Sequence, residues 1–234
     1  MKILSIDSST AVATVALLDD NKVLGEYNLN DKKQHSVLLM PMADKLLKDN
    51  GMKAQDLDGF VISAGPGSFT GLRIGLATIK GMSLGLNKPY ISVSNLDGLA
   101  YNVVTFRGII CPVIDALRGN VYAAVYKSDG EKLEKLCDDC IISLEELGEQ
   151  LKSYEEPVIF IGDGTIKYEN ELKVLRDNVI FPPKHLNYTR AASLGELGLQ
   201  RLLKGERDDI NSSAPVYLRK SQAEREYESR LKTD

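Results

Sequence analysis

The sequence predicts an α/β fold of two units, because two β-hairpins each precede a stretch in which strands and helices alternate. Residues 3–18 predict the first hairpin, with a polar turn at residues 7–10 between runs of small and β-branched side chains. Residues 109–127 predict the second hairpin, with its turn at residues 118–120. Alternating strands and helices are typical of α/β proteins. We therefore expect two lobes, each with a mixed sheet that a hairpin opens and helices flank.

These units divide the chain into a first lobe at residues 1–105 and a smaller α/β lobe at residues 106–188. A helix within residues 189–205, with Thr189 as its N-cap, is expected to pack back on the first lobe. Residues 206–234 form a polar, charged tail that we expect to be extended or loosely packed. The remaining predicted strands cover residues 23–29, 60–63, 89–93 and 158–161, and the remaining helices residues 36–50, 69–86, 96–104 and 144–153.

The composition is that of an ordinary globular protein in water. Of the 234 residues, 43% are hydrophobic and 26% are charged. A formal net charge of −4 gives no general attraction to RNA or to an anionic membrane. No apolar run approaches the ~20 residues of a membrane span, and the sequence becomes acidic at Asp7, too early for a signal peptide. We expect a cytoplasmic protein with no membrane association.

Cysteine and histidine do not predict a metal site. Three cysteines fit a reducing compartment, and Cys137 and Cys140 form a single C-x-x-C. No second pair or nearby histidine completes a zinc site, and the neighbouring carboxylates would raise the thiol pKa values. A structural role is therefore favoured for this pair. His35 and His185 are the only histidines and lie far apart in the sequence, so we expect no metal.

The turn of the first hairpin is the first candidate for chemistry. It reads Asp7, Ser8, Ser9 and Thr10. A carboxylate followed by hydroxyls between two strands can hold a magnesium-bound water and present N–H groups to phosphate. The turn resembles the first phosphate loop of actin and the sugar kinases, D-x-G-[ST]-[ST]. Those proteins place glycine where Ser8 or Ser9 stands, so that backbone can approach phosphate. We predict a degenerate phosphate loop, although polar turns of this kind are also common without a function.

A glycine-rich loop is the second candidate. Residues 63–75 read SAGPGSFTGLRIG, in which Gly65 and Gly67 allow a sharp turn from strand to helix. The loop is neither a Walker A sequence nor a dinucleotide fingerprint, although the helix N-terminus could receive an anion. Small residues continue along the helix as Gly71, Gly75, Gly81 and Gly85. Such a smooth face packs either on the chain's own sheet or on a partner helix, and both interpretations remain open.

These segments carry a specific resemblance. The string at residues 63–75, after IDSST at residues 6–10, is very similar to the TsaB family, also called YeaZ. The similarity continues in VSNL at residues 93–96, in DALRGNVY at residues 115–122 and in APVYLR at residues 214–219. It therefore extends over essentially the whole chain.

The resemblance implies an actin-like (sugar-kinase-type) ATPase fold with a degenerate nucleotide site. It also implies a subunit that works with a TsaD-like catalytic subunit and a TsaE-like ATPase. Together they transfer a threonylcarbamoyl group to the adenosine next to the anticodon, position 37, of ANN-decoding tRNAs. This chain would meet tRNA only indirectly, through the complex. No cofactor is expected to bind tightly, and ATP or ADP would bind only weakly or at a complex interface.

The resemblance also allows the residues of this chain to be compared with the metal site of the catalytic relative. The catalytic relative binds metal through H-x-x-x-H on a helix, which places two imidazoles on one face. The corresponding positions here are Asn95 and Leu99. Leucine cannot bind a metal and asparagine is a poor ligand, so we expect no catalysis by this chain alone.

The partner interface is predicted on two helices, at residues 36–50 and 69–86, because both have a surplus of apolar and small side chains. The same surface would form a homodimer when the partner is absent. The residues assigned to this interface are Leu38, Leu39, Met42, Leu72, Leu76, Ile79 and Met82.

Two other functions remain as alternatives. The chain would be an independent ATP-binding hydrolase or kinase if Asp7 and Thr10 held metal and phosphate. It would be a metallopeptidase, the less favoured alternative, if a metal or a nucleophile with its base were present. A polar cluster of Asp115, Arg118 and Asn120 in the second hairpin is a further candidate contact, although an ordinary turn explains it equally well.

Overall fold

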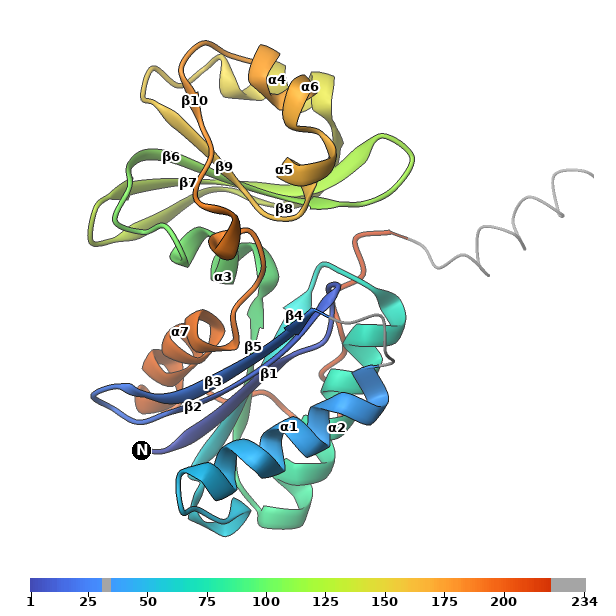
Figure 1. The fold of residues 1–234 in the computed structure, drawn as a ribbon, viewed down its shortest axis with the longest axis vertical. Coiled ribbons are helices and arrows are strands. Elements are labelled where there is room, and N and C mark those ends of the chain that lie inside the picture. The colour runs from blue at the N-terminus through green and yellow to red at the C-terminus, as the bar shows by residue number, and fades with distance from the viewer. Residues whose placement is uncertain (31–34, 220–234) are drawn as a thin grey trace, which may run out of the picture.

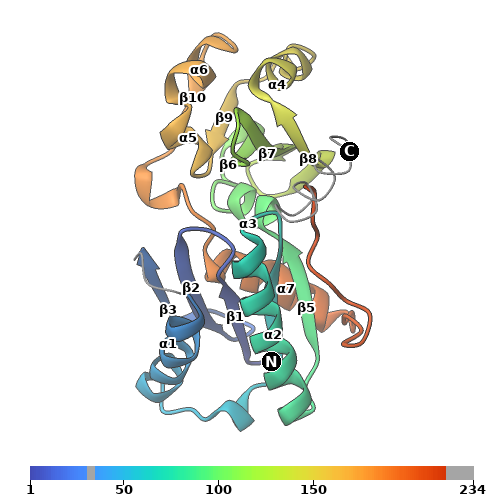
Figure 2. The same cartoon turned by 90° about the vertical axis from the view of Figure 1, so that its right-hand side faces the viewer.

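Two lobes stacked along the long axis make up the structure, a computed structural model that describes residues 1–30 and 35–219 (Figures 1 and 2). Each lobe is built on a five-stranded sheet. The strand order is β3-β2-β1-β4-β5 in the first sheet and β10-β9-β6-β7-β8 in the second. In both sheets an antiparallel hairpin is extended by parallel pairing of its first strand, β1 with β4 and β6 with β9. This repeated arrangement confirms the predicted fold class.

The first lobe contains β1 (Ile3–Asp7), β2 (Val12–Leu18), β3 (Val23–Asn30), α1 (His35–Asp49), η1 (Ala54–Asp56), β4 (Gly59–Gly65), α2 (Phe69–Leu86), β5 (Tyr90–Ser94) and, from the end of the chain, α7 (Ala191–Leu203). The second lobe contains β6 (Arg107–Asp115), β7 (Asn120–Asp129), β8 (Leu133–Ser143), α4 (Leu144–Leu151), β9 (Val158–Ile161), α5 (Gly164–Lys167), α6 (Glu169–Val174), β10 (Val179–Ile180) and η2 (Lys184–Leu186). Helix α3 (Asn95–Tyr101) lies between the two lobes.

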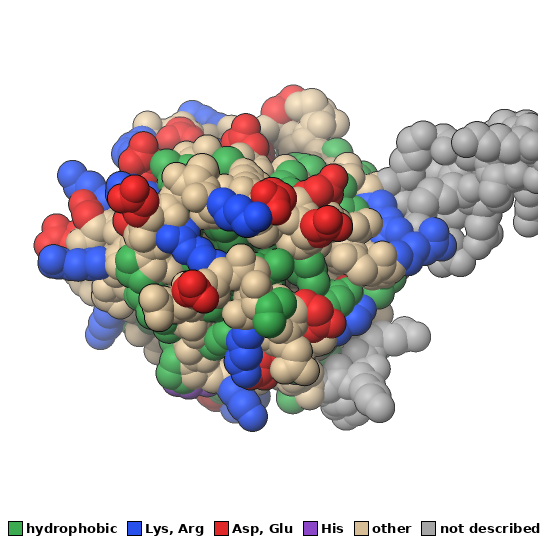
Figure 3. Space-filling model, turned by 90° about the horizontal axis from the view of Figure 1, so that it is seen from above, with side chains coloured by type: hydrophobic (Ala, Val, Ile, Leu, Met, Phe, Trp, Pro, Cys, Tyr) green, Lys and Arg blue, Asp and Glu red, His purple; other side chains and the backbone are tan. Residues whose placement is uncertain are grey.

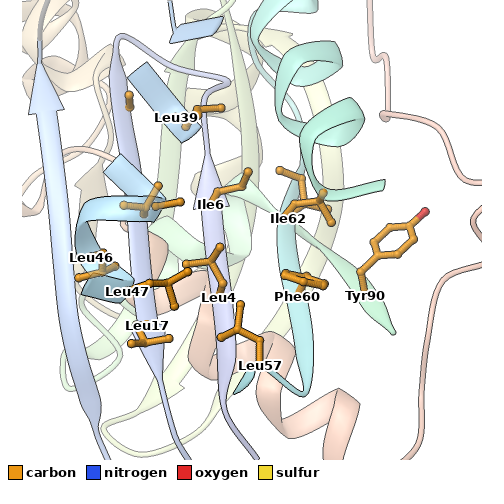
Figure 4. Packing of buried hydrophobic residues seen from close by; sticks show 14 residues of the cluster. Leu4, Ile6, Leu17, Leu39, Leu46, Leu47, Leu57, Phe60, Ile62 and Tyr90 are labelled. Carbon is orange, nitrogen blue, oxygen red and sulfur yellow. The ribbon is translucent and has the colours of Figure 1, made fainter. Parts of the chain in front are cut away.

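Helices cover both faces of the first sheet. Helices α1 and α2 bury one face, where Leu4, Leu47 and Phe60 belong to one apolar cluster (Figure 4). Helix α7 covers the other face through Leu194, Leu199 and Leu202. Every residue of β1 and β2 is therefore buried, as is expected for strands that are covered on both faces.

Helix α3 ties the two lobes together. Residues 1–105 were expected to form one lobe, but Leu96, Leu99 and Val103 are buried in the core of the second sheet. The same helix also contacts α7 and β5 of the first lobe. Tyr122 and Tyr126 lie on the same face of β7, and both are buried in this shared core. The lobes therefore share an apolar connection.

Strand β8 was not predicted from the sequence. It forms the edge of the second sheet and is half-exposed along its length, so charged residues interrupt its alternation. Cys137 and Cys140 lie on this strand. Gln150 Nε2 donates to Cys137 Sγ (2.7 Å), and Cys140 Sγ donates to the Ala123 carbonyl (3.5 Å). Burial, then the neighbouring Cys137 and Asp139, raises the pKa of Cys140, so the structure gives this pair a packing role.

The first turn of α7 is capped by strand residues rather than by Thr189. The N-cap position is Arg190, whose side chain makes no capping bond, so the predicted cap was wrong. Instead the Ala191 N–H donates to Thr14 Oγ1 (3.1 Å), and the Ala192 N–H donates to Glu26 Oε1 (3.0 Å). Arg190 Nε also donates to the Glu26 carboxylate (3.0 Å). A carboxylate at a helix N-terminus is favourable because it faces unpaired N–H groups.

The described part of the tail is anchored to the first lobe by hydrogen bonds. The Asp208 N–H donates to the Tyr90 carbonyl of β5 (2.9 Å), and the Ser92 N–H donates to the Asp208 carboxylate (2.9 Å). Asp208 thus satisfies backbone groups at the β5 edge, whereas most of residues 206–219 are exposed and form no helix or strand. The rest of the predicted tail, residues 220–234, lies outside the described residues.

Charge is mixed over the surface at the end of the second lobe, where basic and acidic side chains alternate with apolar ones (Figure 3). Within the described ranges, no helix has the length and apolar character needed to cross a membrane.

Replacing Glu26 by alanine is expected to lower the free energy of unfolding by about 1–3 kcal/mol, because it leaves the Ala192 N–H and the Arg190 guanidinium without their buried acceptor. The Glu26 side chain is 7% exposed. Urea denaturation checks this value. The exposed pair Lys152 and Glu149 provides the control: Glu149→Ala is expected to change stability by less than ~0.5 kcal/mol. Equal effects of both variants would contradict the capping role.

Candidate functional site

The turn predicted to be a degenerate phosphate loop and the glycine loop lie side by side at the cleft between the lobes. The turn at residues 7–10 connects β1 to β2, and residues 65–68 connect β4 to α2. Strands β1 and β4 pair in parallel, so their carboxyl ends meet at one edge of the sheet. The two loops that the sequence singled out are therefore brought together, and the Ser68 N–H donates to the Ser9 carbonyl (2.7 Å).

Asp7 faces the interior of the loop rather than the cleft. Its side chain is fully buried. Asp7 Oδ1 accepts from the Ser9 N–H (2.9 Å) and from the Ser63 hydroxyl (2.5 Å). The carboxylate thus stabilises the turn internally. This geometry gives no support to the alternative in which Asp7 holds a metal for an independent hydrolase or kinase.

Helix α2 packs on the turn through its first glycines. The Ser8 hydroxyl donates to the Gly71 carbonyl (2.8 Å). A Cβ on Gly71 would lie 1.9 Å from the Ser8 carbonyl oxygen, and one on Gly75 would lie 2.8 Å from Ser8 Oγ. Gly81 and Gly85 have nothing within 4 Å of such a Cβ. The glycines of α2 therefore fall into two groups. Gly71 and Gly75 pack against the chain's own turn, whereas Gly81 and Gly85 face open space.

Glycine-to-alanine substitutions in the two groups are expected to have opposite effects on stability. Gly71→Ala is expected to displace the turn at residues 7–10 and to destabilise the protein by ~2 kcal/mol or more, because the contact is with backbone. Gly81→Ala is the matched control and is expected to stabilise by up to ~1 kcal/mol, since it raises helix propensity without a clash. Thermal and urea denaturation of both variants check this. Destabilisation by Gly81→Ala, or none by Gly71→Ala, would contradict the assignment.

Asn95 joins the two loops. It is fully buried at the start of α3. Its side-chain amide donates to the Pro66 carbonyl (2.9 Å) and to Ser9 Oγ. Leu99, four residues later, is buried in the apolar core. Asn95, which was matched by resemblance to one position of the relative's metal-binding pair, is therefore a structural amide, and Leu99 at the other position is a core side chain.

Two cavities open between the lobes beside these loops. The larger one, about 620 Å³, is bounded by residues of the turn, the glycine loop, the β6–β7 turn and the tail. The smaller one, about 250 Å³, lies toward α7 and is lined by Asn187 and Thr189. Thr10 and Asp163 line both cavities, so the two spaces meet at the centre of the cleft.

Asp163 was missed as a site residue, although the sequence GDG at residues 162–164 ends a predicted strand. Burial raises the pKa of its carboxyl, and the charge of Asp115 also raises it. Asp163 Oδ1 accepts from the Asp115 N–H (3.1 Å). Burial also raises the pKa of Asp115. Hydrogen bonds from Lys167, the Leu117 N–H and Tyr168 lower this pKa by more, so the net pKa of Asp115 lies below its usual value.

The proposed polar cluster of the second hairpin does not form one site. Asp115 bonds to Lys167 (2.8 Å), whereas Arg118 is exposed. Asn120 closes the turn through its N–H to the Leu117 carbonyl (3.3 Å). Leu117 and Arg118 have positive φ values of 64° and 58°, which side chains of this kind rarely adopt. The turn is thus held in an uncommon conformation at the cleft.

Asp163→Asn is expected to stabilise the protein at pH 7. A raised folded pKa means that the stability contribution is complete below the unfolded value of about 4 and is lost as pH rises through the folded pKa. Asparagine retains the acceptor for the Asp115 N–H without the charge. Urea denaturation between pH 4 and 7 should therefore show a gain that grows with pH. A control, exposed Asp138→Asn, should show no such growth, and a loss of stability at pH 7 for Asp163→Asn would contradict the prediction.

The predicted interface residues are largely turned inward. Leu39, Leu72 and Ile79 are at most 2% exposed and belong to the core beneath α1 and α2. These three side chains pack against the chain's own sheet, so they are not available to contact a partner. The other four, Leu38, Met42, Leu76 and Met82, are half-buried against the same cluster. The outward apolar residues are Val37, Met40 and Leu84, exposed by 60%, 47% and 67%.

No group of three histidine, cysteine, aspartate or glutamate side chains within the described ranges is placed to hold a metal ion. His185 is exposed on η2, and α1 begins at His35. The described residues therefore offer no metal centre for the metallopeptidase alternative.

The repeated lobes and the cleft with two apposed loops define a protein of the actin-like, sugar-kinase-type class. The solved ROK hexokinase from Thermus thermophilus shares this fold, with a TM-score of 0.50 at 9% identity over 87% of this chain and 100% of that chain. The family model described as TsaD, tRNA N6-adenosine threonylcarbamoyltransferase, matches residues 22–227.

Two more similar proteins identify the family. The tRNA threonylcarbamoyladenosine biosynthesis protein TsaB of Bacillus subtilis (strain 168) is 36% identical over 225 residues, 96% of each chain. The solved structure of YeaZ from Pseudomonas aeruginosa has a TM-score of 0.80 at 25% identity and covers 93% of this chain and 99% of that chain. The chain belongs to the TsaB family, as the sequence resemblance predicted.

Proposed function

We propose that this chain is a non-catalytic scaffold or activating subunit in the biosynthesis of threonylcarbamoyladenosine at position 37 of ANN-decoding tRNAs. One observation carries the proposal. The parts that would act on phosphate and metal in this fold serve internal packing here. Asp7 and Ser8 bond within the loops, and Leu99 is a core residue. Relatives that carry the name tRNA threonylcarbamoyladenosine biosynthesis protein support the proposal.

The partners we propose are a TsaD-like catalytic subunit and a TsaE-like ATPase, with tRNA reached indirectly through them in the cytoplasm. The acidic net charge of −4 supports the indirect role, because a direct RNA-binding protein usually carries a basic surface. We propose that ATP or ADP binds the isolated chain only weakly, or at the complex interface, since the serines of the turn are buried. The isolated chain would form a homodimer.

The surface we assign to the catalytic partner is the outward side of α1 and α2. Val37, Met40 and Leu84 expose apolar side chains there, and Gly81 and Gly85 would allow a partner helix to approach closely. Because the partner has a related fold, its equivalent helices would pack on this surface. A specific interface of ~1,200–2,000 Å² requires several such contacts.

Leu84→Arg is expected to abolish co-purification with the catalytic partner while the chain remains folded. Leu203→Arg is the matched control, since Leu203 is a leucine of similar exposure (58%) on α7, away from this surface. Reconstitution with partner subunits, tRNA, threonine, bicarbonate and ATP measures the consequence. Modification should require this chain and fail with Leu84→Arg. Equal modification without the chain would contradict the proposed function, and normal binding by Leu84→Arg would contradict only the surface.

A further inference from the structure

Thr189 has a buried hydroxyl without a hydrogen-bond partner. Its side chain is fully buried, and Thr189 Oγ1 makes no hydrogen bond to any of the described residues. The capping role expected of it is taken by Thr14, which accepts from the Ala191 N–H. A buried polar group normally finds a partner, because leaving it unpaired costs free energy. The Thr189 hydroxyl can therefore still form a hydrogen bond with a ligand.

This hydroxyl lies in the wall of the smaller cavity between the lobes, about 250 Å³ in volume. A cavity of ~150 Å³ can hold a benzene ring, and drug-sized ligands occupy ~300–1,000 Å³. The space therefore suits one ring with a short chain. Val12, Leu99 and Ile114 also line the cavity and are at most 5% exposed. The body of such a ligand would contact these apolar side chains.

The wall around the hydroxyl is held by α3 and by the second lobe. Figure 1 shows this part of the chain, in orange, passing from the second lobe to α7 of the first. Asn102 Nδ2, at the end of α3, donates to the carbonyls of Leu186 and Tyr188 (both 3.0 Å). Asn187 Oδ1 accepts from the Gly162 N–H (3.2 Å). The cavity is thus formed by the fold itself, as is usual for small-molecule sites.

Asp163 brings a carboxylate to the same cavity. Lys167, whose charge also acts on Asp163, forms its ion pair with Asp115 instead (2.8 Å). Lys184 lines the cavity too, but its side chain is exposed, so solvent and salt screen its charge. A cationic group of a ligand inside the cavity would therefore be the direct counter-ion of the Asp163 carboxylate.

We propose that this cavity binds a small primary amine in its ammonium form. The ammonium group donates to the Asp163 carboxylate and to Thr189 Oγ1, and the apolar body lies against Val12, Leu99 and Ile114. An ammonium group has three donors and no acceptor, so it suits two acceptors in one cavity. Hydrogen bonds between ionised groups are also stronger than neutral ones. This site belongs to the isolated chain and does not depend on a partner subunit.

Phenethylamine tests the site because it joins one ring to a short chain that ends in an ammonium group. Phenethyl alcohol is its uncharged counterpart. Calorimetry at pH 7 is expected to give a dissociation constant of ~1 mM or below for the amine. Binding of the alcohol is expected to be at least about tenfold weaker. NMR shifts of the amides at residues 162–164 and 187–189 check where the amine binds.

Two substitutions remove the polar contacts one at a time. Asp163→Asn, which is expected to remain folded as described above, should weaken phenethylamine binding at least about tenfold, and Thr189→Val about three- to tenfold. Ser5→Ala is the matched control, since the buried Ser5 hydroxyl also lacks a partner among the described residues but lines neither cavity. It should change the affinity by less than about twofold. Neither Thr189→Val nor Ser5→Ala should lower the free energy of unfolding, because each removes an unpaired polar group.

Several results would overturn the amine site. Equal binding of phenethylamine and phenethyl alcohol would show an apolar cavity without a cation site. Absence of amine binding up to ~10 mM, or unchanged affinity in Asp163→Asn or Thr189→Val, would also reject the proposal. A loss of stability in Thr189→Val without ligand would show that the hydroxyl already has a partner, such as a buried water, and would overturn the assignment. A failed reconstitution of tRNA modification would leave all of these outcomes unaffected.

Discussion

The close approach of α2 to the β1–β2 turn is the contact on which the rest of the site depends. Gly71 lies so near the Ser8 carbonyl that no side chain fits between them. This contact fixes the start of α2, which in turn fixes the glycine loop, Asn95 and the ring of Phe69. The turn at residues 7–10 is thus held in place by contacts within the chain. The same packing that makes the loop rigid also uses the groups that would otherwise meet a ligand.

The lobes are joined on two sides of the cleft. On one side α3 buries apolar residues in the second lobe's core, and its Asp97 accepts from Tyr126 (2.6 Å) and Lys135 (3.0 Å) of the second sheet. On the other side the Val216 N–H donates to the Ala64 carbonyl and the Arg219 guanidinium donates to the Ala116 carbonyl. A protein with such connections presents its helices and its cleft in one fixed relation. A fixed relation of this kind is what the proposed supporting role requires.

Sequence periodicity predicted most elements of the fold, and the bounds of α2 and β9 agree with the prediction. It failed at β8, because an exposed edge strand tolerates charges that hide its alternation. It also failed for Leu39, Leu72 and Ile79, since an apolar helix face predicts burial without telling whether the chain or a partner provides it. Arg219 belonged to a recognised segment, but only the folded chain brings it to Ala116.

The path of the chain through the first lobe has a consequence for its synthesis. The strands of the first sheet leave the ribosome early, but α7, which covers their second face, comes about a hundred residues after β5. Asp208, which bonds to the backbone edge of β5, is synthesised later still. Until then the nascent first lobe exposes an apolar face and an open strand edge. Its folding is completed from the far end of the chain, so a truncated translation product would be prone to aggregate.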